Sequence, residues 1–68
     1  MSAHMSKLVR IKSTCVVASR ILYVERDQEV VGIAIEGENM LTFECQDEAN
    51  ASAAFLRFVE DLEKALAQ

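Results

Sequence analysis

Apolar and polar residues alternate along much of the first two-thirds of the chain, as they do in strands that bury one face. Segments with this pattern, or with many β-branched residues, cover about 7–12, 15–18, 20–26, 30–36 and 40–45. Short polar connections separate these segments, and Gly37 and Asn39 mark the clearest turn. The pattern therefore predicts an antiparallel meander of four or five strands.

The same alternation indicates which side of each strand faces the core. The residues expected to point inward are Val9, Ile11, Val31, Ile33, Ile35, Leu41, Phe43 and Cys45. On the segment 30–36, the opposite side carries Val30 and Ala34 beside Gly32. This second side is neither large nor strongly polar, so we interpret it as a surface suited to contact with another chain.

The last third of the chain, about 47–67, has a helical period and predicts one amphipathic helix across the sheet. Asp47 is suited to cap its first turn, with Asn50 as the rival cap. At 100° per residue, the central apolar stripe consists of Ala51, Phe55, Val59, Leu62 and Leu66. Two further pairs flank this stripe, Phe58 with Ala65 and Leu56 with Ala67. The apolar arc covers roughly half of the circumference, which is wider than a surface helix needs.

These elements predict an α+β fold in one small domain, residues 7–68. Residues 1–6 have no periodicity and read as a disordered leader, a cloning remnant that precedes or includes Met5. The segment 13–24 has a competing helical interpretation, which would align Val17 with residues 21 and 24. The adjacent branched residues Val16 and Val17 disfavour that helix, so we split the segment into two strands at the polar break near 19–20.

The small size of the domain predicts self-association. A chain of 68 residues buries a modest fraction of its surface, and disulfides, metals or oligomerisation usually compensate. With two cysteines and one histidine, the chain has few residues for disulfides or for metal binding. We therefore expect a homodimer or small ring, formed through the helix flanks, a sheet edge, or both. The residues expected at the interface are Val30, Leu56, Phe58 and Ala65.

The chain offers little for catalysis. Its two glycines, Gly32 and Gly37, do not have the spacing of a phosphate-binding loop. Cys15 and Cys45 are not in a metal-ligand spacing, and the histidine His4 lies in the leader, so neither thiol has an evident base. We expect both cysteines in the core. The hypothesis is a non-catalytic protein without metal or cofactor, and a small-ligand-binding protein is one alternative.

Charge divides the chain into a basic and an acidic part. Residues 1–26 carry five cations and one acid, a net charge of +4, whereas residues 27–68 carry a net charge of −8. A basic strand face would favour nucleic acid or an acidic partner. The residues that would make this contact are Lys7, Arg10, Lys12, Arg20, Tyr23 and Arg26. The alternative is that the two parts neutralise each other within the fold.

The longest uncharged run near the start, residues 13–19, is far shorter than the roughly 20 residues of a membrane span. No signal peptide is evident either. We therefore expect a soluble, cytoplasmic protein that makes no membrane contact.

Overall fold

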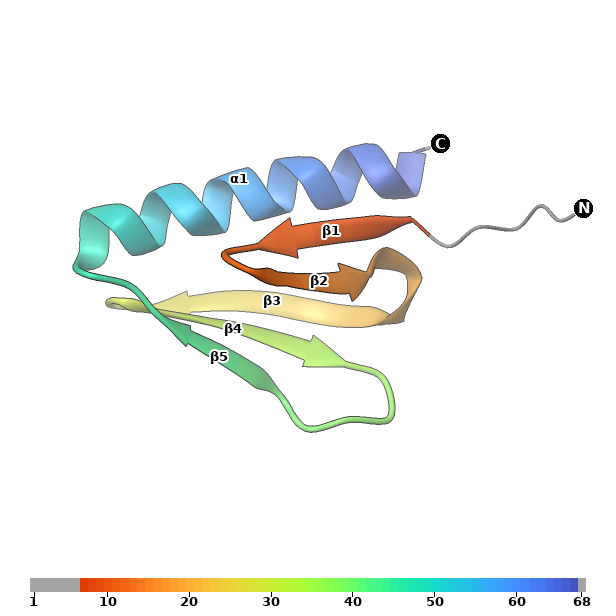
Figure 1. The fold of residues 1–68 in the computed structure, drawn as a ribbon, viewed down its shortest axis with the longest axis horizontal. Coiled ribbons are helices and arrows are strands. Elements are labelled where there is room, and N and C mark those ends of the chain that lie inside the picture. The colour runs from red at the N-terminus through yellow and green to blue at the C-terminus, as the bar shows by residue number, and fades with distance from the viewer. Residues whose placement is uncertain (1–6, 68) are drawn as a thin grey trace, which may run out of the picture.

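The computed structural model describes residues 7–67, which form antiparallel strands and one long helix (Figure 1). The elements are β1 (Leu8–Ile11), β2 (Thr14–Val17), a single 3₁₀ turn η1 (Ala18–Arg20), β3 (Ile21–Asp27), β4 (Val30–Ile35), β5 (Leu41–Glu44) and α1 (Glu48–Ala67). These elements confirm the predicted α+β class. Each observed end lies within one residue of the predicted range. The leader, residues 1–6, lies outside the described residues.

The strands form two sheets where the pattern had suggested one continuous meander. β1 pairs with β2, and β3, β4 and β5 form a separate three-stranded sheet. The turn η1 separates the two sheets at the predicted polar break, and no longer helix forms in the segment 13–24. A register shift between Ile21 and Tyr23 then leaves Leu22 in a bulge at the start of β3.

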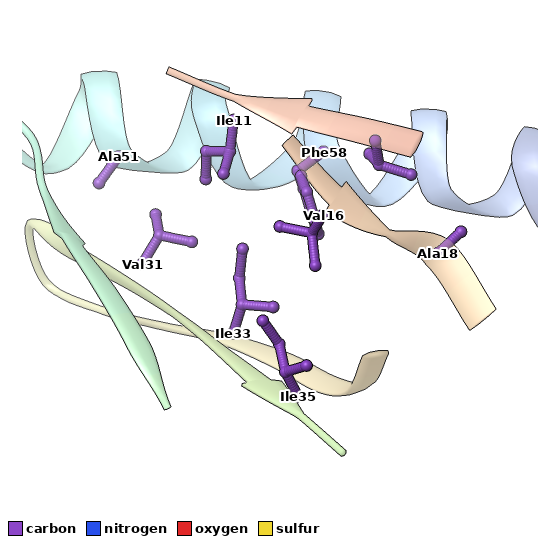
Figure 2. Close-up of a cluster of buried hydrophobic side chains, with 9 residues drawn as sticks. Ile11, Val16, Ala18, Val31, Ile33, Ile35, Ala51 and Phe58 are labelled. Atoms are coloured by element: carbon purple, nitrogen blue, oxygen red, sulfur yellow. The ribbon is translucent and has the colours of Figure 1, made fainter. Parts of the chain in front are cut away.

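The core lies between the inner face of the three-stranded sheet and a cover made of the β1–β2 hairpin and α1. Figure 2 shows Ile33 and its β4 neighbours pointing toward Val16 and Phe58. The buried apolar cluster consists of Val9, Ile11, Val16, Ala18, Val31, Ile33, Ile35, Ala51 and Phe58. Leu41, Phe43 and Cys45 pack against it while partly exposed. The predicted inward side is therefore confirmed for β1, β4 and β5.

The helix begins where the sequence predicted, because Asp47 caps it. The Asp47 carboxylate accepts a hydrogen bond from the Asn50 backbone N–H at 2.8 Å, so Asp47 is the cap and Asn50 is not. α1 then runs beside β1 and also contacts β3, β4 and η1 (Figure 1).

The side of α1 that enters the core differs from the prediction. Phe58, expected on a flank that contacts another chain, is 1% exposed at the centre of the core. Leu66, expected in the core stripe, is 59% exposed. The residues of α1 that pack inward are Ala51, Phe55, Phe58, Leu62 and Ala65, a stripe rotated by roughly 40° from the predicted one. The apolar arc of α1 is wide enough for either rotation. In the structure α1 contacts both β1 and β3, and its rotation about its own axis buries Phe58.

Candidate interaction surfaces

The outer face of the three-stranded sheet carries an apolar patch that nothing in the described chain covers. Tyr23 of β3 lies beside Ala34 of β4 in the register, and Met40 precedes β5 on the same side. Tyr23 is 54% exposed and Met40 36% exposed. Leu22, in the bulge, lines a shallow hollow together with Met40. We call Leu22, Tyr23, Ala34 and Met40 the outer apolar patch.

Gly32 lies next to this patch and is buried beneath its neighbours. A Cβ atom at Gly32 would lie 3.2 Å from Met40 Sδ and 3.4 Å from Glu25 Cγ, so these two side chains close over the glycine. Further along β4, Val30 lies between Asp27 and Glu44 in the register. The outer face therefore changes from apolar at the Tyr23 end to acidic at the Val30 end.

A second exposed apolar surface follows one flank of α1. Leu56 is 58% exposed and Leu66 is similarly exposed, with Val59 half-buried between them. Ala65, expected at an interface, is half-buried and packs against the chain's own core. Of the four residues predicted for association, Leu56 is exposed and Val30 is half-buried on the outer face of the sheet. Phe58 is a core residue, as described above.

Three basic residues of the first part of the chain donate hydrogen bonds to backbone carbonyls of the second part. Lys12 Nζ donates to the Glu44 carbonyl, and Arg26 Nη1 donates to the Gln28 carbonyl at 2.9 Å. Arg20 Nη2 donates to the Glu36 carbonyl at 3.0 Å, and its Nη1 lies 3.8 Å from Glu38 Oε2. The acceptors all belong to the acidic part of the chain. Of these contacts, only that of Arg20 with Glu38 joins a cation to a carboxylate, so it alone supports the alternative in which the two parts neutralise each other.

Of the predicted nucleic-acid surface, Arg10 and Lys12 lie together in one groove, whereas Tyr23 lies elsewhere. Arg10 lines a groove of about 400 Å³ between β1 and α1, together with Lys12, Arg57 and Asp61. Tyr23 lies on the outer face of the other sheet, and Lys7 is exposed just before β1. The one tyrosine is thus not interleaved with the cations, as a stacking surface for bases would require.

The cysteines differ from each other and, in one case, from expectation. Cys15 is exposed, which corrects its predicted place in the core, whereas Cys45 is half-buried against the core. The reason is the register of β2, which turns Val16 inward and therefore its neighbour outward. Both thiols are free. Within residues 7–67, no group of three His, Cys, Asp or Glu side chains is placed to hold a metal ion.

No helix in residues 7–67 is both long and apolar enough to cross a membrane. Comparisons with known protein families, with curated proteins and with solved structures found no match to this chain. Sequence reasoning identified Val30 but missed Leu22 and Met40. Alternation along the strand places Leu22 opposite Tyr23, and the bulge that changes this is not visible in the sequence.

Proposed function

We propose that this protein is a non-catalytic module that forms homodimers through the outer face of its three-stranded sheet. The observation that carries the proposal is β4, whose residues are apolar or glycine on both faces. An antiparallel sheet with one solvated face usually has polar residues on that face. A strand that is apolar on both sides is typical of a sheet covered on both sides.

Two-fold symmetry suits the distribution of charge on this face. In a two-fold dimer the same patch meets itself, so the outer apolar patch of one copy would lie against that of the other. If the two-fold axis passes near Tyr23, the acidic end of each copy, formed by Asp27 and Glu44, lies at the opposite end of the interface from that of the other copy. The two acidic ends then form part of a polar rim, as many interfaces have, and do not repel each other directly.

The experiment is a measurement of mass by multi-angle light scattering over a range of protein concentrations. The chain is expected to exceed its monomer mass of 7.6 kDa and to approach twice that value as concentration rises. Tyr23→Glu places a charge at the centre of the patch and should return the mass to that of the monomer. A control with similar exposure is Leu8→Glu on β1, which should leave the mass unchanged.

Two results would contradict this assignment. A monomer mass for the unmodified chain at every concentration would exclude the dimer. A dimer that survives Tyr23→Glu but is lost in Leu56→Glu would transfer the interface from the sheet to the helix flank, where Leu56 is exposed.

A further inference from the structure

β2 and β5 belong to different sheets and are not hydrogen-bonded to each other, but residues of both line one hollow, and we call the line along which the two strands meet the seam. At one end, Lys12 in the β1–β2 turn reaches across the seam to the Glu44 carbonyl of β5. At the other end lies a hollow of about 180 Å³. Its lining consists of Cys15, Val16, Val17, Arg20, Ile35, Glu38 and Leu41.

β2 presents its backbone edge to the seam. Successive side chains of a strand point to opposite faces, so a hollow lined by three consecutive residues of β2 adjoins the edge of the strand. The Ala18 N–H donates to the Lys7 carbonyl at 2.9 Å. Hydrogen-bonded pairs alternate along an antiparallel ladder, so the N–H and C=O groups of Cys15 and Val17 point away from β1.

β5 also has backbone groups that point away from its partner strand. The Cys45 N–H donates to the Glu29 carbonyl at 2.8 Å, immediately beyond the register pair of Val30 with Glu44. By the same alternation, Thr42 and Glu44 turn their N–H and C=O groups away from β4. The outward groups of β2 lie beside the hollow, which Arg20 and Glu38 also line, and β5 reaches it at Leu41, next to the outward groups of Thr42.

We propose that this seam binds an extended segment of another protein as an added strand between β2 and β5. Main-chain hydrogen bonds to an exposed edge, with side chains in pockets, are a known mode of peptide recognition. A second folded copy does not suit the seam, because its strands already use one edge and would reach only one side. An unfolded segment can pair with both edges. This inference is independent of dimerisation through the outer apolar patch.

The seam also indicates what the segment contains. The hollow at Leu41 suits one apolar side chain. Pairing at Glu44 would replace the Lys12 ammonium on that carbonyl and release it for a carboxylate. Leu41 and Glu44 are three residues apart on β5, which corresponds to about 10 Å along a strand. The segment therefore carries an acidic residue about three positions from an apolar one.

The test begins with a displayed library of random twelve-residue peptides, selected on the full chain carrying Tyr23→Glu so that the dimer surface plays no part. Sequences with the predicted apolar and acidic spacing should be enriched. The best peptide, made synthetically, should bind the unmodified chain as well. Its copy with N-methylated alternate amides should bind about tenfold more weakly or worse, since each lost backbone hydrogen bond weakens binding.

A substitution in the protein gives a matched comparison. Thr42→Pro removes an N–H that faces the seam and leaves the β4–β5 ladder intact, because proline is tolerated on edge strands. It should weaken peptide binding by a similar factor. If this variant does not fold, the N-methylated peptide still decides, because it is tested on the unmodified chain. A selected peptide that binds equally well after N-methylation, or a selection without enrichment, would overturn the proposal.

Amide hydrogen exchange tests the seam without any ligand. The amides of Cys15, Val17 and Thr42 should exchange quickly in the free chain and slow down when the peptide is bound. Slow exchange at these three amides in the free chain, comparable to that of Val31, would show that β2 and β5 pair directly. That result would also overturn the proposal.

Discussion

The two faces of β4 carry residues of similar polarity but are covered in different ways. On the inner face, Val31 and Ile33 are fully buried beneath the hairpin and α1. On the outer face, Gly32 is shielded by the side chains of Met40 and Glu25, and Ala34 beside it is 9% exposed. Low exposure therefore has two origins in β4. A packed second layer excludes water from large side chains, whereas small residues are shielded by their immediate neighbours.

The largest expected effect comes from removing the cover of the inner face. Phe58→Ala should lower the free energy of unfolding by about 3–5 kcal/mol, because a fully buried aromatic side chain leaves a cavity. The core of a domain below about 70–80 residues rarely supplies more than about 3–5 kcal/mol, so the variant is expected to be largely unfolded. Urea denaturation followed by circular dichroism measures the change. The exposed Leu66→Ala is the control and should change stability by less than about 0.5 kcal/mol.

A smaller effect is expected from truncating the inner face itself, and it can be compared directly with the outer face. Ile33→Ala should cost about 2–5 kcal/mol at any protein concentration, since Ile33 is in the monomer core. Val30→Ala should cost less in the monomer, where Val30 is half-buried, and should weaken association at the acidic end of the outer face. Thermal denaturation at several protein concentrations separates the two. Equal, concentration-independent losses would mean that both faces are packed in the monomer.

The smallest effect is expected at Gly32, where the outer face is shielded only by flexible side chains. Gly32→Ala should change stability by no more than about 0.5 kcal/mol, because Met40 and Glu25 can shift to admit a methyl group while the unfolded chain loses entropy. Gly37→Ala is the matched control. Gly37 has a φ of 78°, so alanine there should cost about 1–2 kcal/mol. A loss at Gly32 larger than at Gly37 would show that the outer face is rigidly packed.

Most of the fold could be predicted from local patterns, and most of the candidate surface could not. The alternation in residues 30–36 was sufficient to identify Ile33 and its inward neighbours. Asp47 was identifiable as a cap from its position before a helical period. The outer apolar patch depends on the register between β3, β4 and the residue before β5, which brings Tyr23 and Met40 to one side. Such pairing joins residues far apart in the sequence, so local periodicity does not contain it.

Local patterns in the sequence were sufficient for the elements, their order and the inward side of β1, β4 and β5, because these depend on backbone preferences and on a period of two or 3.6 residues. Only the tertiary structure decided the rest. It separated the strands into two sheets at η1 and rotated α1 so that Phe58 enters the core. It also left the edges of β2 and β5 unpaired across a seam. These features depend on side-chain packing and strand pairing between distant segments. A helix with a wide apolar arc, or a strand that is apolar on both faces, can pack against more than one partner.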